Sequence, residues 1–207
     1  MSLKAHITST AIQLFARSGI KRVSMDDVAR KSSVSKRTLY DFFNDKEALL
    51  IEVLIAIYEP FVEQMEFFEK QSDTVLEMIL LFNEKMMEKP TWLCEDFLED
   101  IKRYPRAFQM MIATKQSFLK KLIEILKRGI NESVFMSDIN YDIISLMAQQ
   151  QFSKSEPAKL YHMYTPQEVH NTMMFIFLRG ICTDKGRDII DKFLSKKRYE
   201  RDFGEQL

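Results

Sequence analysis

Apolar residues recur at intervals of three and four positions along the first part of the chain, which is the spacing of one face of an α-helix. The pattern predicts a first helix that stops at Gly19, because glycine is common just after helix ends. A short second helix is expected after Ser24, which stands three positions before Asp27 and approximates a capping box. A third helix is expected from its cap, Ser35, to about Phe43. Three short helices joined by tight turns therefore open the chain.

A longer helix is expected next, because Asn44 is suited to cap it and Glu47 stands at its third position. Pro60 is expected to kink or end this helix. Helical spacing, interrupted by polar and proline-containing stretches, continues to about Tyr199 and nowhere changes to the alternation of a strand. Since the 207 residues include only 5 Gly and 5 Pro, we predict an all-α protein of about nine or ten helices.

The charge of the chain is unevenly distributed. Lys and Arg number 30 and so do Asp and Glu, which gives no net charge. Residues 1–50, however, carry nine bases and five acids, a net charge of +4, and the remainder carries −4. A basic N-terminal part on an acidic body indicates a polyanionic partner at one end of the molecule.

Other features favour a cytoplasmic protein that is not an enzyme. The opening stretch MSLKAHITSTAIQLF lacks the apolar core of a signal peptide. The longest apolar run, Met173–Leu178, is far shorter than the ~18 residues of a membrane span. Cys94 and Cys182 show no metal spacing or disulfide framework, so we expect two buried free thiols. The three His form no zinc spacing, and no nucleophile motif, P-loop or dinucleotide glycine pattern is present. We therefore expect no metal and no cofactor, and the acidic run EDFLED is better interpreted as a solvated helix face.

The second and third helices have the arrangement of a DNA-binding helix-turn-helix, in which the second helix of the pair enters the major groove. Lys36 and Arg37 stand at the first turn of the third helix, where such a helix meets bases and phosphates. Leu39 and Phe43 fall on the opposite side and are expected to anchor the helix in the core. The alternative is a helical hairpin with a solvated cationic face.

The stretch AIQLFARSGIKRVSMDDVARKSSVSKRTLYDFFNDKEALL, residues 11–50, resembles the N-terminal domain of TetR-type regulators over about residues 4–54. The resemblance implies a DNA-binding domain over residues 1–46, with the helix-turn-helix at about 24–43. It also implies a helical ligand-binding and dimerisation domain over residues 47–207. A homodimer would read a palindromic operator whose half-sites lie roughly one helical turn, ~34–36 Å, or a multiple of it apart.

The resemblance assigns DNA contact to Ser24, Ser35, Lys36, Arg37, Thr38, Tyr40 and Lys46. Lys46 corresponds to a phosphate-binding lysine, and Ser24 to a helix start that touches phosphate. Asp41 and Phe42 depart from the pattern, since many members have an uncharged residue and a Tyr or His there. Phe42 cannot donate a hydrogen bond to phosphate, and the Asp41 carboxylate is repelled by phosphate. Phosphate contact at these two positions is therefore not expected, and Asp41 would instead have to accept from a cytosine amine or pair with a neighbouring Arg.

The helix that contains TMMFIFLRGIC is apolar almost all round, so it must be buried on several sides. We expect it to form an isologous four-helix dimer interface with YDIISLMAQQQF. The expected interface residues are Ile144, Met147, Met173, Phe177 and Ile181. The alternative is complete burial within one subunit.

Methionine and phenylalanine are abundant in the middle helices, which would suit an adaptable pocket for an apolar effector. The candidate pocket residues are Met78, Phe82, Met86, Trp92, Phe97, Phe108, Met111 and Phe118. The alternative is ordinary core packing.

We predict a DNA-binding transcriptional repressor that an apolar effector releases from its operator. The alternative from another class is a helical metabolite-binding protein or enzyme that does not bind DNA, and a third possibility is an activator or adaptor with the same fold. Binding to duplex DNA that weakens steeply with salt would separate the first two.

Overall fold

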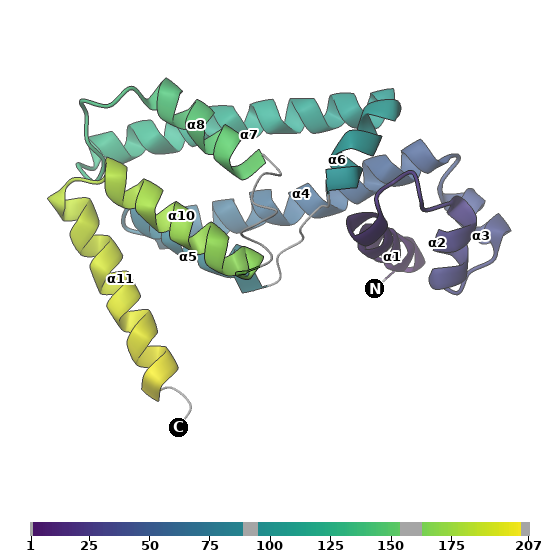
Figure 1. Cartoon of the computed structure of the whole chain (residues 1–207), viewed down its shortest axis with the longest axis horizontal. Helices are drawn as coiled ribbons and strands as arrows, with labels where there is room; N and C mark the ends of the chain where they lie inside the picture. Colours follow the sequence, from purple (N-terminus) through teal and green to yellow (C-terminus); the bar gives the residue numbers. More distant parts are fainter. Residues whose placement is uncertain (1, 89–94, 154–162, 204–207) are drawn as a thin grey trace. The chain divides into compact units, whose positions relative to one another are not determined.

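The computed structural model describes residues 2–88, 95–153 and 163–203 (Figure 1). These residues form ten α-helices and one 3-10 helix, which confirms the predicted all-α fold. The chain divides into two compact units, and the long helices α4 (Lys46–Gln71) and α7 (Pro105–Asn131) each contribute to both. The first unit comprises Met1–Glu63 and Lys89–Ser117, and the second comprises Gln64–Glu88 and Phe118–Leu207. The functional division predicted at residue 46 remains a prediction; α4 begins at Lys46 and continues without interruption into the second unit.

The first unit contains the predicted helix-turn-helix. Besides the first parts of α4 and α7, it is built from α1 (Leu3–Ser18), α2 (Met25–Lys31), α3 (Lys36–Phe42), α6 (Glu95–Asp100) and the 3-10 turn η1 (Ile101–Arg103). The predicted stop at Gly19 is confirmed: its φ of 74° is left-handed, and a Cβ there would lie 2.7 Å from the Cβ of Asp96. The predicted cap at Ser24 is also confirmed, as a complete capping box with Asp27.

The turn between α2 and α3 closes by a Schellman motif. Ser33 adopts a φ of 57°, and its N–H donates to the carbonyl of Arg30 at 3.2 Å. The Val34 N–H donates to the carbonyl of Ala29 at 3.0 Å. The next residue, Ser35, then caps α3 through a 3.0 Å hydrogen bond from the Thr38 N–H. Backbone bonds therefore fix the angle at which α3 leaves α2.

Two details of α4 differ from the prediction. Asp45, not Asn44, caps the helix: its Oδ1 accepts from the Ala48 N–H at 2.6 Å, and the helix begins at Lys46. Pro60 lies inside α4 and does not end it. Buried residues before and after the proline, such as Leu54 and Met65, hold the helix in place, and this packing outweighs the lost backbone bond.

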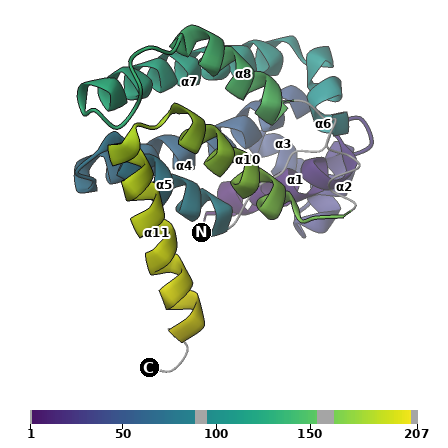
Figure 2. The same ribbon diagram turned by 60° about the vertical axis from the view of Figure 1, so that its left-hand side comes forward.

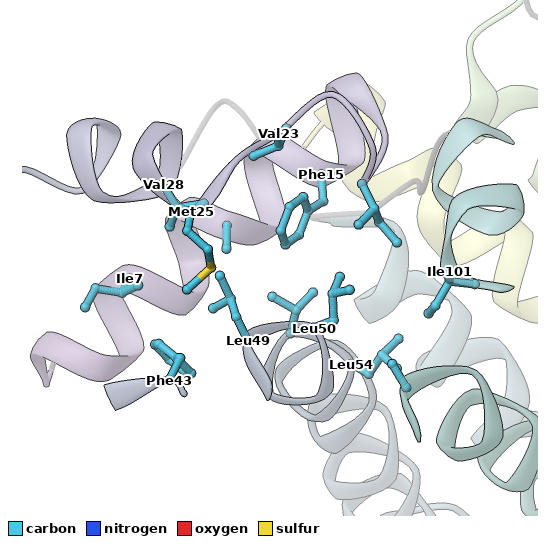
Figure 3. Close-up of a cluster of buried hydrophobic side chains, with 14 of the residues drawn as sticks. Ile7, Phe15, Val23, Met25, Val28, Phe43, Leu49, Leu50, Leu54 and Ile101 are labelled. Carbon is cyan, nitrogen blue, oxygen red and sulfur yellow. The ribbon is translucent and has the colours of Figure 1, made fainter. Parts of the chain in front are cut away.

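One apolar cluster holds the first unit together (Figure 3). It joins α1, α2, the end of α3, the start of α4 and the α6–η1 segment. The residues labelled in Figure 3 are Ile7, Phe15, Val23, Met25, Val28, Phe43, Leu49, Leu50, Leu54 and Ile101. Helix α3 is seated in this cluster by Leu39, which is fully buried, and by Phe43, which is 2% exposed. The prediction that these two residues anchor the third helix is confirmed.

The second unit forms a separate apolar core. Besides the ends of α4 and α7, it is built from α5 (Val75–Glu88), α8 (Tyr141–Ser153), α10 (Pro166–Ile181) and α11 (Asp184–Phe203). Figure 2 shows α11 starting beside the end of α10 and running on to the C-terminus. A polar link crosses this core: His170 Nε2 of α10 lies 2.9 Å from Asn83 Oδ1 of α5.

Candidate nucleic-acid interface

The outward side of α3 presents polar and cationic side chains, because its apolar anchors face the core. Arg37, Tyr40 and Asp41 are all exposed. Within the described residues, the Arg37 guanidinium makes no ion pair or hydrogen bond, so all its donors are available to a ligand. Tyr40 is 41% exposed.

Lys36 is held by an acid of the preceding helix. Its ammonium lies 2.8 Å from Oδ1 of Asp26 in α2, and both side chains remain more than half exposed. The hydrogen bond and charge of Asp26 raise the pKa of Lys36. Asp26 is not among the predicted site residues, although its place in the first turn of α2 is typical for an acid. A phosphate approaching Lys36 must compete with this carboxylate.

The hydroxyl groups predicted to touch DNA also hold the helix starts. The Ser24 hydroxyl donates to Asp27 Oδ2 at 2.6 Å and accepts from the Asp27 N–H at 3.1 Å. The hydrogen bonds that the Ser24 hydroxyl and the Ser24 backbone N–H donate to the Asp27 carboxylate lower the pKa of Asp27. The Ser35 and Thr38 hydroxyls lie 2.8 Å apart. The exposed serines Ser24 and Ser35 mark the N-termini of α2 and α3, where backbone N–H groups favour an anion.

Lys46 connects the start of α4 to the loop between α1 and α2. Its ammonium donates to the carbonyl of Ile20 at 2.6 Å and lies 5.9 Å from the ring centroids of Phe15 and Tyr104. Partial burial lowers the pKa of Lys46, and the negative charge of Asp100 opposes that shift. In this conformation the Lys46 ammonium is hydrogen-bonded to the protein's own backbone. The predicted phosphate contact of Lys46 remains a prediction, and it requires the ammonium to be shared with, or released from, Ile20.

Three further contacts lie close to this part of the first unit. Asp100 of α6 accepts from the Lys21 N–H at 2.6 Å. At the start of α7, Arg106 lies 2.9 Å from Glu47 and 3.0 Å from Asp45 at the start of α4. These contacts tie α6 and α7 to the segments on either side of the helix-turn-helix.

The predicted dimer residues separate into two groups. Ile181 is 3% exposed, and Ile144 and Phe177 are partly buried against the core of the second unit, so these residues contribute to packing within the chain. Their contact with a second subunit remains a prediction. Met147 is exposed and Met173 is half-buried.

The strongly exposed apolar residues on these two helices include three that the prediction missed. Ile143 and Leu146 of α8 are 55% and 58% exposed, and Ile176 of α10 is 69% exposed. Residues 143, 146 and 147 follow helical spacing, so the signal was present in the sequence. Together with Met147 they form what we call the α8–α10 apolar face (Ile143, Leu146, Met147 and Ile176).

The predicted effector residues are divided between the two cores. Phe97 and Met111 are buried in the first unit, and Phe108 packs against them. Met78 and Phe82 belong to the core of the second unit. Met86 on α5 is half-buried and Phe118 on α7 is 47% exposed, whereas Trp92 lies outside the described residues. Neither core contains all of these residues.

The part of the chain that the structure describes shows no metal site, no membrane-spanning helix and no reactive cysteine. No group of three or more His, Cys, Asp or Glu residues could hold a metal ion there. Among the same residues, no helix is both long enough and apolar enough to cross a bilayer. Cys182 is buried, and burial raises the pKa of its thiol to about 11, which makes it a poor nucleophile.

Sequence comparisons find similar proteins for the N-terminal part and, in one case, for most of the chain. Residues 7–53 match the family described as bacterial regulatory proteins, tetR family. The putative mycofactocin biosynthesis transcriptional regulator MftR of Mycobacterium tuberculosis is 43% identical over 44 residues, which are 21% of this chain and 22% of that protein. The uncharacterized HTH-type transcriptional regulator YvaF of Bacillus subtilis is 25% identical over 177 residues, which are 80% of this chain and 88% of that protein.

Solved structures share the fold over most of the chain. The ketosteroid transcriptional regulator KstR2 of Mycobacterium tuberculosis superposes with a TM-score of 0.67 at 18% identity, covering 88% of this chain and 96% of that one. The regulator FadR of Bacillus subtilis, in complex with stearoyl-CoA, gives a TM-score of 0.64 at 18% identity, covering 86% and 98%. At such identities the likeness concerns the fold.

Proposed function

We propose that this chain is a transcriptional regulator of the tetR family and acts as a homodimeric repressor of a palindromic operator. The match of residues 7–53 to that family supports the proposal. A small apolar effector releases it from the DNA. The observation that carries the proposal is the construction of α3: Leu39 and Phe43 seat the helix in the core, and Arg37 projects from the opposite side without a partner among the described residues.

In the proposed complex α3 lies in the major groove. Arg37 donates two hydrogen bonds to a guanine, a contact worth about 1–3 kcal/mol of discrimination. Lys36 exchanges Asp26 for a phosphate, and the hydroxyls of Thr38 and Tyr40 donate to the backbone. The phosphates near the N-termini of α2, α3 and α4 are bound with the help of Ser24, Ser35 and Lys46.

The α8–α10 apolar face supports dimerisation. Four large apolar side chains on two helices are mostly exposed in the single chain, and their burial in an isologous four-helix contact would remove them from water. Such a dimer presents two copies of α3, and reading one face of B-form DNA requires them to lie ~34–36 Å, or a multiple of it, apart.

An effector in the C-terminal domain is proposed to change that spacing. KstR2 is named as a ketosteroid transcriptional regulator and FadR was solved in complex with stearoyl-CoA. By analogy with these proteins of the same fold, we infer a large apolar ligand for this chain. In this chain, Met78, Phe82 and Met86 offer adaptable apolar contacts in α5. The effector would shift α4, whose first residue is Lys46, and its unequal affinity for the two states would set the size of the response.

The first test is binding to the DNA upstream of the protein's own gene, measured by gel shift at ~0.15 M salt. Arg37→Ala is expected to weaken binding roughly 5- to 150-fold, the equivalent of 1–3 kcal/mol. Arg103→Ala is the matched control, because Arg103 is also exposed in the first unit but lies in η1. Equal binding by the wild type and the Arg37→Ala variant would reject the reading role of Arg37.

A further inference from the structure

Asp41 occupies the centre of the outward face of α3. Successive residues of a helix are about 100° apart, so Arg37 and Asp41 lie on one side, opposite the buried Leu39 and Phe43. The structure agrees, since both polar residues are exposed while the two anchors are almost completely buried. Asp41 therefore belongs to the part of the helix that would reach deepest into a groove.

The carboxylate of Asp41 is not neutralised within the protein. Among the described residues it forms no ion pair or hydrogen bond, even with Arg37 one turn earlier. The other acid next to this surface, Asp26, is paired with Lys36 at 2.8 Å. A free negative charge thus stands in the middle of a surface that the proposed function places against a polyanion.

Base edges in the major groove offer few hydrogen-bond donors that could bind a carboxylate. Guanine presents two acceptors and thymine one, and all of these repel a carboxylate. Adenine places an acceptor, N7, beside its amine. Cytosine presents its N4 amine as a donor, and this amine is the usual partner of Asp and Glu side chains.

We propose that Asp41 determines sequence specificity by accepting a hydrogen bond from the N4 amine of a cytosine in each half-site. This inference rests on the proposed function. Residues four apart on a helix have Cβ atoms about 5–6 Å apart. With a rise of ~3.4 Å per base pair, the cytosine lies one or two base pairs from the guanine read by Arg37.

The test begins with the operator that the wild type selects from random duplexes. Each half-site position is then changed to all four bases, and affinities are measured by fluorescence anisotropy. The proteins compared are the wild type, Asp41→Ala, Asp41→Asn and Glu59→Gln. Glu59 is an exposed acid whose removal changes the net charge equally, and it lies about 20 Å along α4 from Lys46.

The wild type should prefer cytosine at one position by roughly 5- to 100-fold. Asp41→Ala should lose the preference at that position alone, and Asp41→Asn should shift it toward adenine, which pairs with Asn side chains. Glu59→Gln should keep the wild-type preferences. Since Asp41 is exposed, circular dichroism should show all variants to be folded.

Two outcomes would overturn the inference. If Asp41→Ala binds every duplex more tightly by one common factor and keeps all base preferences, Asp41 acts only by repulsion. If the wild type selects a sequence but shows no cytosine preference that depends on Asp41, the specificity role fails while the proposed function stands. A wild type that selects no sequence would instead remove the proposed function, and this inference with it.

Discussion

The burial of Leu39 predicts a large loss of stability when its side chain is shortened. Leu39→Ala removes three carbons from a fully buried site in the core of the first unit. At about 0.8 kcal/mol per buried CH₂, the transfer of these carbons to water accounts for about 2.4 kcal/mol. The unfilled space adds to this, so the free energy of unfolding should fall by about 2.5–5 kcal/mol.

The assay is urea denaturation followed by circular dichroism at a fixed protein concentration, because the stability of the proposed dimer would depend on concentration. Tyr40→Ala, one residue along the same helix, is the matched control: its side chain is 41% exposed, and its loss should cost less than about 1 kcal/mol. Tyr40→Ala should nevertheless weaken DNA binding. A cost below about 1 kcal/mol for Leu39→Ala would show that α3 is not seated as described.

Other predictions concern dimerisation, the reading surface and pH. Leu146→Glu puts a charge on the α8–α10 apolar face and should yield monomers by light scattering, whereas unchanged dimers would place the interface elsewhere. Asp26→Asn frees Lys36 and should strengthen DNA binding while steepening its salt dependence, as measured by anisotropy; unchanged affinity would show that the pair does not compete with phosphate. Burial lowers the pKa of His170, so its contribution to stability is complete above about pH 6.5 and is lost as the pH falls through the folded-state pKa. Thermal melts should show that His170→Gln reduces this loss, and an identical pH profile would exclude His170 as its source.

The helix-turn-helix was predictable because its determinants are local. Ser24, Ser35 and Gly19 act on the backbone within a few residues, and the spacing of Leu39 and Phe43 fixes the buried side of α3. The cap of α4 was placed one residue too early because Asn44 and Asp45 are both good caps. Only the structure shows that Asp45 bonds to Ala48.

Contacts between distant segments were not predictable in the same way. The pairing of Lys36 with Asp26 depends on the Schellman turn between α2 and α3, and the contact of Lys46 with Ile20 spans 26 positions. Which residues of α8 face outward was not predictable, because an apolar residue alone does not show which neighbour covers it. Ile144 faces the core while Ile143, the adjacent residue, is exposed.

The most direct test of the central claim is the salt dependence of duplex binding. If Lys36 and Lys46 of both subunits neutralise about four phosphates, the logarithm of the binding constant should fall against the logarithm of salt concentration with a slope of about −3.6. Anisotropy measured across a salt series on the selected operator gives this slope. A slope near zero would contradict the account, because α3 and the start of α4 would then not lie against the DNA backbone.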